Sequence, residues 1–454
     1  MRHLIPKKIL SLYHLALAFV GALVYRFPAR SLVVIGVTGT KGKTTVSELI
    51  AAILEEAGYS VALSNGVRFK IAKVSEEPNL TRMTMPGRFF LQRFLRTAVS
   101  AGCTHAVVEM TSEGAAQHRH RFLSLDALVF TNLAPEHIES HGSLEAYRDA
   151  KISIARSLAR SRKRSRFIVA NLDDAEGKRF LDAAYPAEQH PFSTRDAEPY
   201  EIKNNETALT FDACRMRSPL VGIFNLSNIL AAMTLARALS VGTEVIKRAI
   251  ESFAGVPGRM EYVSEGQPFD VIVDYAHTPD SLKNAYAFLR ESISNFPPPA
   301  GGPISNQISN SQIPKAQTPQ DGTKKLICVL GSTGGGRDKW KRPEMGRIAA
   351  EYCDRIILTN EDPYDEVPES IMADIERGIQ GPAKVQNSKF KILNSCEKIL
   401  DRRLAIRAAL GMARHGDTVV ITGKGSDPSI CGPRGIKEPW SDAAVAREEL
   451  KRLL

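Results

Sequence analysis

A glycine-rich stretch near the start of the chain limits most strongly what the sequence can fold into. Residues 36–45 read GVTGTKGKTT; they complete a short β-branched run at Leu32–Val37 and begin a helical pattern at Thr44–Ala57. In such a strand–loop–helix unit, backbone N–H groups and the helix N-terminus face the phosphate oxygens of a nucleotide. Lys43 would reach the β- and γ-phosphates, and the Thr44 hydroxyl would bind Mg²⁺. The segment predicts a nucleoside triphosphate site.

The rest of the chain repeats the alternation of apolar runs and helical patterns. Strands that alternate with helices form mainly parallel sheets, so the sequence predicts an α/β protein. The runs expected to be strands are Ala106–Val108, Ala127–Phe130, Phe167–Ala170, Val271–Val273, Leu326–Leu330, Arg355–Leu358 and Thr418–Ile421.

A chain of 454 residues is too long for one compact core and indicates two or three domains. The sequence Gly-Val-Pro-Gly at 255–258 follows a helical pattern and predicts a hinge. We therefore expect a hydrophobic N-terminal segment at 1–30, a central domain at 31–254 and a C-terminal domain at 255–454. Residues 292–323, rich in Pro, Gly, Ser, Asn and Gln, predict a flexible insertion.

The net charge of the chain narrows the classes of binding partner, and the spacing of its cysteines narrows the kinds of metal site, disulfide and compartment. The net charge of +10 favours acidic partners such as phosphates, carboxylates or an anionic membrane surface. The basic run at Arg160–Arg166 has no interleaved aromatic residue, so it predicts a solvated loop and no nucleic-acid partner. Six cysteines without a Cys-x-x-Cys pair predict neither a zinc site nor a disulfide framework, and they fit a reducing compartment.

The N-terminal segment leaves two alternatives open. Ile9–Tyr25 contains 17 residues without a formal charge, flanked by Lys7, Lys8, Arg26 and Arg30. This length is at the lower limit for a helix that spans a bilayer. The segment is either a hydrophobic helix packed on the following domain or a membrane anchor or interfacial helix.

The form Thr-Gly-Thr-x-Gly-Lys-Thr-Thr resembles the phosphate loop of the Mur ligases, the ATP-dependent amino-acid ligases of peptidoglycan synthesis, and other motifs follow in the family's order. Glu109-Met110-Thr111-Ser112 resembles the family's Glu-Val-Ser-Ser, whose glutamate binds Mg²⁺. The segment from Thr131 to His137 resembles the one that holds the histidine of a second metal ion, and Lys151 matches a lysine that the family carbamylates. The resemblance implies a P-loop central domain followed by a Rossmann-like C-terminal α/β domain.

The resemblance also assigns roles to single residues. It implies catalytic roles for Lys43, Glu109, His137 and Lys151, and metal binding by Thr44, Glu109, His137 and Lys151. It implies contacts to ATP from Gly39, Thr40, Gly42, Lys43, Thr44, Thr45, Asn225, Asn228, Arg259, Asp274 and His277. For the acceptor and the incoming amino acid it implies Thr84, Ser112, Arg337, Asp362, Tyr364, Gly423 and Asp427.

Within the family, the chain resembles the branch that adds the third residue of the stem peptide. Its Thr-Gly-Lys-Gly-Ser-Asp at 422–427 is similar to that branch's Gly-Lys-Gly-His-Glu. The diaminopimelate-adding members use Asp-Asn-Pro-Arg where this chain has Glu361-Asp362-Pro363-Tyr364. Loss of that arginine and retention of acidic groups favour an amino acid with a side-chain amine, lysine or ornithine. The phosphate loop is reached at residue 36, whereas typical members begin with a domain of about a hundred residues that binds the UDP-sugar, so we expect altered acceptor recognition.

The expected cofactors are ATP and two Mg²⁺ ions, together with a carbamylated Lys151, and the expected partners are a muramyl-peptide-like acceptor and a free amino acid. We expect a cytoplasmic monomer, with attachment to the inner face of the membrane if residues 9–25 meet lipid. ATP would bridge the two large domains, with closure about 255–258. Three alternatives are a folylpolyglutamate- or cyanophycin-synthetase-like ligase, an amidotransferase-partner subunit, and a membrane-tethered nucleotide-binding module without catalysis.

Overall fold

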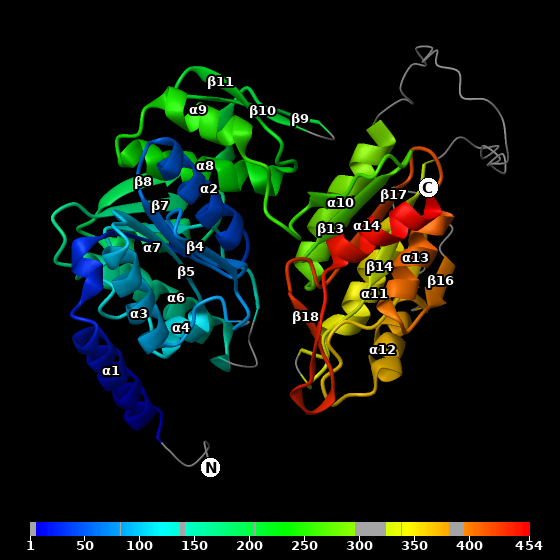
Figure 1. Cartoon of the computed structure of the whole chain (residues 1–454), viewed down its shortest axis with the longest axis horizontal. Helices are drawn as coiled ribbons and strands as arrows, with labels where there is room; N and C mark the ends of the chain where they lie inside the picture. The colour runs from blue at the N-terminus through cyan, green and yellow to red at the C-terminus, as the bar shows by residue number, and fades with distance from the viewer. Residues whose placement is uncertain are drawn as a thin grey trace. The chain divides into compact units, whose positions relative to one another are not determined.

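The computed structural model describes residues 6–81, 83–136, 141–203, 206–295, 324–336, 338–380 and 395–454. The chain divides into two compact units, Met1–Val256 and Pro257–Leu454 (Figure 1). The prediction of an α/β protein with mainly parallel sheets is confirmed in both units.

The first unit is built on an eight-stranded sheet with the order β4-β3-β2-β5-β1-β6-β7-β8. The strands from β2 to β8 in this order run parallel, and β3 and β4 complete the sheet as antiparallel neighbours. A separate three-stranded sheet contains β9 to β11. The bounds are β1 Val33–Thr38, β2 Val61–Ser64, β3 Arg68–Ile71, β4 Ser75–Pro78, β5 His105–Met110, β6 Ala127–Phe130, β7 Phe167–Asn171, β8 Glu188–Phe192, β9 Glu201–Ile202, β10 Thr207–Phe211 and β11 Cys214–Ser218.

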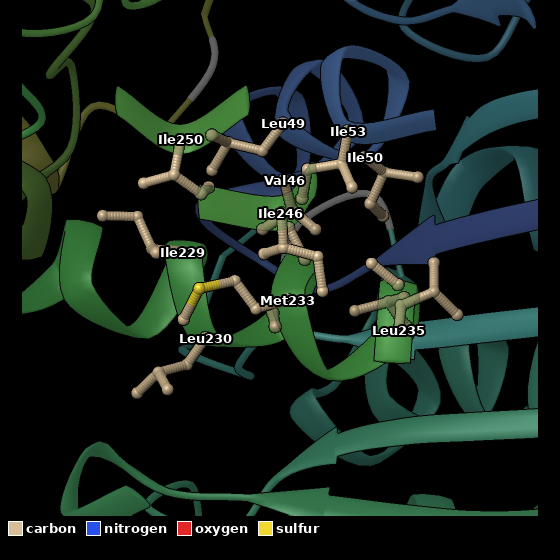
Figure 2. Close-up of a cluster of buried hydrophobic side chains, with 14 of the residues drawn as sticks. Val46, Leu49, Ile50, Ile53, Ile229, Leu230, Met233, Leu235, Ile246 and Ile250 are labelled. Atoms are coloured by element: carbon tan, nitrogen blue, oxygen red, sulfur yellow. The ribbon is translucent and has the colours of Figure 1, made fainter. Parts of the chain in front are cut away.

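Helices cover this sheet with apolar side chains. Val46, Leu49, Ile50 and Ile53 of α2 meet side chains of α8 and α9 in one buried cluster, which Figure 2 shows. Because the phosphate loop leads directly into α2, this cluster fixes the direction in which the loop is held. The bounds are α1 Lys7–Val24, α2 Lys43–Glu56, α3 Arg88–Ser100, α4 Ser112–Ala116, α6 Leu144–Ala159, α7 Gly177–Ala184, α8 Ile223–Ala238 and α9 Thr243–Ser252, with short 3₁₀ turns at Pro28–Ser31 and Thr194–Ala197.

The N-terminal hydrophobic segment forms α1, which packs beside α3 (Figure 1). Ala18 and Ala22 are buried at this contact, and the Arg96 guanidinium donates to the carbonyls of Tyr25 and Arg26. The inner face of α1 therefore agrees with the first of the two alternatives, in which the segment is a hydrophobic helix packed on the domain that follows. Among the described residues, no helix combines the length and hydropathy needed to cross a membrane.

Both edge strands of the large sheet carry residues that are unusual for strands. β4 reads Ser-Glu-Glu-Pro and is exposed along its length, and β8 contains Pro191. The interior strands β1 and β5, in contrast, are buried almost throughout.

The second unit has a six-stranded sheet with the order β12-β13-β17-β14-β15-β16, parallel from β13 onward, and a small β18–β19 ribbon. The strand bounds are β12 Glu261–Tyr262, β13 Asp270–Asp274, β14 Leu326–Leu330, β15 Arg355–Leu358, β16 Ser395–Lys398, β17 Thr418–Thr422, β18 Ser429–Cys431 and β19 Lys437–Pro439. The helices are α10 Pro279–Asn295, α11 Lys341–Tyr352, α12 Pro368–Gln380, α13 Arg402–Met412 and α14 Asp442–Leu453, with a 3₁₀ turn at Pro433–Gly435. Since α10 continues to Asn295, the predicted insertion at 292–323 begins as helix; residues 296–323 lie outside the described residues.

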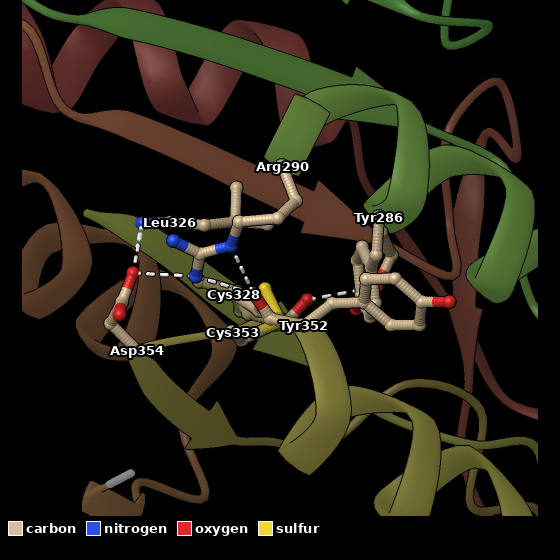
Figure 3. The surroundings of a disulfide bond; sticks show 9 residues. Tyr286, Arg290, Leu326, Cys328, Tyr352, Cys353 and Asp354 are labelled. Atoms are coloured by element: carbon tan, nitrogen blue, oxygen red, sulfur yellow. Dashed lines mark hydrogen bonds and ion pairs between the residues drawn. A yellow bond between two sulfur atoms is a disulfide. The ribbon is translucent and has the colours of Figure 1, made fainter. Parts of the chain in front are cut away.

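One sequence prediction is wrong in this unit, because two cysteines form a disulfide. Cys328 lies in β14 and Cys353 directly follows α11, and their Cα atoms are 6.2 Å apart. The β14–α11 connection returns the end of the helix to the flank of its own strand, which sequence spacing alone could not show. Arg290 donates to the Tyr352 carbonyl and pairs with Asp354 beside this bond (Figure 3).

Candidate active site

The phosphate loop, residues 39–42, is held by the segment that follows the neighbouring strand β6. The Thr40 N–H donates to the Asn132 carbonyl at 2.8 Å, and the Lys41 N–H donates to the Asn132 side-chain oxygen at 2.9 Å. The Thr131 hydroxyl donates to the Lys41 carbonyl at 2.7 Å. The loop is thus braced along its length before any ligand binds.

Two glycines of the loop leave no room for a side chain. Gly39 has a φ of +148°, and a Cβ there would lie 1.9 Å from the Thr131 hydroxyl oxygen. Gly42 has a φ of +79°, and its Cβ would lie 2.1 Å from the Asn228 side-chain oxygen. These positions let the backbone curl tightly enough to present its N–H groups, as a phosphate site requires.

The charged groups that the sequence singled out meet at the start of α2. The Thr44 hydroxyl donates to Glu109 Oε2 at 2.9 Å, and Lys43 Nζ lies 3.9 Å from Glu109 Oε1. The Gly66 N–H donates to Glu109 Oε2 at 3.0 Å, and Thr84 Oγ1 lies beside the same glycine. A threonine hydroxyl and a buried carboxylate are oxygen donors that suit Mg²⁺.

Lys151 lies on α6 and is buried beneath the loop. Its Nζ donates to the Gly39 carbonyl at 2.6 Å and lies 5.0 Å from the centre of the Tyr147 ring. Burial, reinforced by the neighbouring charge of Lys43, lowers the pKa of Lys151 to about 7. The lowered pKa makes the neutral amine, the form that reacts with CO₂, more accessible near pH 7 than it is for an ordinary lysine.

The first turn of α8 lies against the loop from the other side. The Asn228 amide donates to Asn225 Oδ1 at 3.1 Å, and the Asn225 amide donates to the Val221 carbonyl at 2.9 Å. Both side chains are buried, as is Thr45.

Ser112 is buried at the start of α4, and its hydroxyl donates to Glu113 Oε2 at 3.3 Å. The predicted metal ligand His137 lies outside the described residues.

In the second unit, predicted Asp274 and His277 lie at the carboxyl end of the parallel strand β13, whereas Arg259 precedes β12. Asp274 ends β13 and accepts from the N–H groups of Met260 and Ala276, both at 2.8 Å. The Arg259 guanidinium stacks 4.1 Å from the centre of the Tyr275 ring. His277 Nδ1 lies 2.7 Å from the Tyr275 carbonyl. Carboxyl ends of parallel strands share one edge of a sheet, which is where α/β proteins bind ligands.

A compact charged cluster follows β15 and β17, and we name it the Glu361 cluster: Glu361, Asp362, Lys424 and Asp427. Lys424 Nζ is buried and donates to both oxygens of Asp362 at 3.0 Å and to Asp427 Oδ2 at 2.9 Å. Glu361 Oε1 accepts from the Thr333 hydroxyl at 2.9 Å, and its Oε2 is buried with no hydrogen-bond partner among the described residues. Burial raises the pKa of Glu361, against the lowering influence of Lys424.

The remaining predicted substrate residues lie around this cluster. A Cβ on Gly423 would lie 2.3 Å from Glu361 Oε2, so the glycine keeps this carboxylate oxygen uncovered. Tyr364 has a φ of +51°, and its N–H donates to the Cys431 carbonyl at 3.0 Å. Arg337 lies outside the described residues.

Sequence reasoning missed two residues that the structure places at these positions. Tyr147 donates or accepts a 2.8 Å hydrogen bond with Thr40 and lies one helical turn before Lys151, a spacing that could have placed both on one face of α6. Glu361 was read as part of a motif and not as a site residue, although its buried, unpartnered oxygen is the distinctive feature of its cluster.

Comparisons with known proteins agree with this geometry. The model of the Mur ligase middle domain matches residues 37–236, and that of the Mur ligase glutamate ligase domain matches residues 258–295 and 314–425. The chain belongs to the Mur ligase family. As a member of it, the chain is an ATP-dependent ligase that forms amide bonds, and ATP and magnesium dependence are general in the family.

Relatives of the Mur ligase align along nearly its whole length. UDP-N-acetylmuramyl-tripeptide synthetase of Roseiflexus sp. (strain RS-1) is 35% identical, with 96% of this chain and 82% of the relative covered. A UDP-N-acetylmuramoyl-L-alanyl-D-glutamate–2,6-diaminopimelate ligase of Syntrophomonas wolfei is 34% identical over the same shares of the two chains. A solved structure of an enzyme with the latter name matches with a TM-score of 0.59 at 28% identity, covering 93% of this chain and 79% of the other.

Proposed function

We propose that this Mur ligase joins a free amino acid to a carboxylate of a UDP-N-acetylmuramoyl-peptide-like acceptor during synthesis of peptidoglycan precursors. The acceptor carboxylate would take the γ-phosphoryl group of ATP, and the amino group would then displace phosphate from the acyl phosphate, giving an amide, ADP and phosphate. The convergence of Lys43, Thr44, Glu109 and buried Lys151 at the phosphate loop carries this proposal. The names of the aligned relatives support the acceptor class.

Each residue of the phosphate-loop site has a task in this reaction. Lys43, at the start of α2, would lie along the β- and γ-phosphates, while N–H groups of the loop other than those of Thr40 and Lys41, which donate to Asn132, would hold the phosphate oxygens. Thr44 and Glu109 would hold one Mg²⁺ ion, and Lys151, as its carbamate, would hold a second together with His137. Bound Mg²⁺ supplies charge neutralisation for phosphoryl transfer. Tyr147 and Thr40 would keep the loop fixed against α6 during the reaction.

The lowered pKa of Lys151 supports the carbamylation that the family resemblance implies. A lysine with an ordinary pKa is almost entirely protonated at pH 7 and reacts poorly with CO₂. The buried amine of Lys151, with a pKa of about 7, is available for this reaction. The product converts a buried cation into an oxygen ligand, which suits a hard metal ion.

We further propose that the Glu361 cluster selects an amino acid with a side-chain amine, such as lysine or ornithine. Asp362 and Asp427 both form ion pairs with Lys424, so these two carboxylates present less net negative charge to a bound amino acid than the sequence implies. Glu361 Oε2, which has no hydrogen-bond partner in the part of the chain that the structure describes, would accept from an ammonium group of the amino acid. The charge of that ammonium would in turn favour the ionised carboxylate.

Residues 31–254 would bind the phosphates of ATP and the acceptor, and residues 255–454 would bind the amino acid. Because the enzyme consumes ATP, we propose a cytoplasmic location, and we propose that it acts as a monomer.

The test is phosphate release from Mg-ATP with UDP-N-acetylmuramoyl-L-Ala-D-Glu across a panel of amino acids. We expect release that requires both acceptor and amino acid, with lysine or ornithine preferred over diaminopimelate. Lys43→Ala should abolish release while the circular dichroism spectrum is unchanged. ATP binding without release for any amino acid would refute the proposed acceptor, and unchanged release by Lys43→Ala would refute the site.

A further inference from the structure

Helix α1 exposes its large apolar side chains and buries its small ones, which is the reverse of an ordinary surface helix. Its inner face is lined by small residues, and a Cβ added to Gly21 would lie 3.6 Å from the Arg88 carbonyl of α3. Its outer face consists of large apolar side chains with exposed fractions between 42% and 66%. These residues are Ile9, Leu12, Tyr13, Phe19, Val20, Leu23 and Val24. Surface helices of soluble domains normally place such residues inward and polar residues outward.

This orientation of α1 is fixed by polar contacts along its inner side. Ser11 Oγ lies 2.7 Å from His118 Nε2, and His14 Nδ1 lies 3.0 Å from an Arg88 guanidinium nitrogen. Phe19, which belongs to the outer face, is partly covered because its ring also packs against Phe27 and Phe122. The apolar stripe is therefore held outward, since rotating the helix would break these contacts.

The surroundings of the stripe are cationic and contain no carboxylate from either helix. No Asp or Glu occurs in residues 6–47 or 79–108, the stretches that include α1 and α3. Arg26, Arg30 and Arg93 are exposed there. In the basic loop 160–166, the Lys163 ammonium donates to the carbonyl of Leu32, eight residues after α1 ends, and pairs with Asp126 at 2.9 Å.

We propose that this surface, the outer face of α1 together with exposed Arg26 and Arg30 after the helix and Arg93 of α3, docks onto an anionic phospholipid bilayer. An apolar stripe bordered by arginines is the pattern of a helix that lies in the headgroup region with its apolar side toward the acyl chains. The helix lies along the bilayer and does not cross it, consistent with its length and hydropathy. A second copy of the chain fits this surface poorly, because cations would face cations.

The test is flotation of the full-length protein with vesicles of phosphatidylcholine alone or of phosphatidylcholine with 30% phosphatidylglycerol. We expect binding to the anionic vesicles that weakens as salt rises. The variant Leu12→Ser/Val20→Ser/Leu23→Ser should bind at least tenfold more weakly, because burial of even one such side chain is worth roughly tenfold. Arg26→Gln/Arg93→Gln should lose about 25-fold, at about fivefold for each cation.

A matched control replaces three exposed apolar residues elsewhere, Val74→Ser/Val367→Ser/Leu404→Ser, and should float like the parent. A single Leu12→Trp variant reports directly on the stripe, since its fluorescence should shift to the blue on addition of anionic vesicles. Absence of flotation with anionic vesicles would overturn the proposal. A concentration-dependent dimer that the α1 variant dissolves would also overturn it and assign the stripe to self-association.

Discussion

Because Lys151 is buried under the phosphate loop, we expect that replacing it with an uncharged residue increases the free energy of unfolding. Lys151 Nζ is fully buried, and its pKa falls from 10.5 to about 7. At about 1.36 kcal/mol for each pH unit, holding the charged form in the folded state costs about 5 kcal/mol below pH 7. Lys151→Met keeps the length of the side chain without the charge. The lost hydrogen bond to Gly39 subtracts about 1 kcal/mol from the gain.

The dependence on pH has a definite sign. Between pH 7 and 10.5 the unfolded chain holds a proton on Lys151 that the folded chain has released, so the stability of the parent rises with pH in that window. The methionine variant lacks this rise. Its advantage of about 4 kcal/mol below pH 7 should therefore shrink by about 1.4 kcal/mol for each pH unit above 7.

The assay is urea unfolding of parent and variant at pH 6.5, 7.5, 8.5 and 9.5 in CO₂-free buffer. Lys178→Met, which replaces an exposed lysine of α7, serves as the control and should change little at any pH. Adding bicarbonate should stabilise the parent and not the methionine variant if Lys151 forms a carbamate. A difference between parent and variant that stays constant from pH 6.5 to 9.5 would refute the lowered pKa and the reasoning built on it.

Three further predictions concern the loop, the Glu361 cluster and the disulfide. Gly42→Ala should weaken binding of a fluorescent ATP analogue more than tenfold, because its Cβ would collide with Asn228; Gly58→Ala, also at positive φ but in open space, should leave binding unchanged. Glu361→Gln should lower kcat/KM for an amino acid with a side-chain amine about tenfold or more and spare ATP binding, and equal losses for amino acids without that amine would contradict the proposed role. Cys328→Ala/Cys353→Ala should lose about 3.5 kcal/mol of unfolding free energy, as expected for a closed loop of 25 residues, and dithiothreitol should lower the urea midpoint of the parent but not of the variant.

Most of the strand pattern could be predicted from the sequence, because buried parallel strands are continuous apolar runs. The run at Leu326–Leu330 coincides with β14, and that at Thr418–Ile421 lies within β17. The phosphate loop was equally evident, since Gly39 and Gly42 occupy conformations that only glycine adopts readily. Local sequence encodes these features directly.

Features that depend on how distant segments meet could not be read in this way. Cys328 and Cys353 are brought together by the return of α11 along β14, and no spacing rule gives that pairing. In the sequence, the acidic residues after β15 favour an amino acid with a side-chain amine, but the sequence could not show that Lys424, 62 residues away, pairs with Asp362. The direction in which α1 turns its large side chains also required the structure, since its apolar residues are distributed around the whole helix.

The composition of the outermost strands bears on how the protein behaves when it is concentrated. Glu76, Glu77 and Pro78 on β4, and Pro191 on β8, offer few unpaired N–H groups to an incoming strand and place charge beside one edge. Sheet-to-sheet addition of one molecule to another is thereby discouraged at both ends of the large sheet. Aggregation of newly synthesised chains should therefore not begin by pairing at these edge strands. Replacing the charged residues and the proline of β4 would remove the protection at that edge.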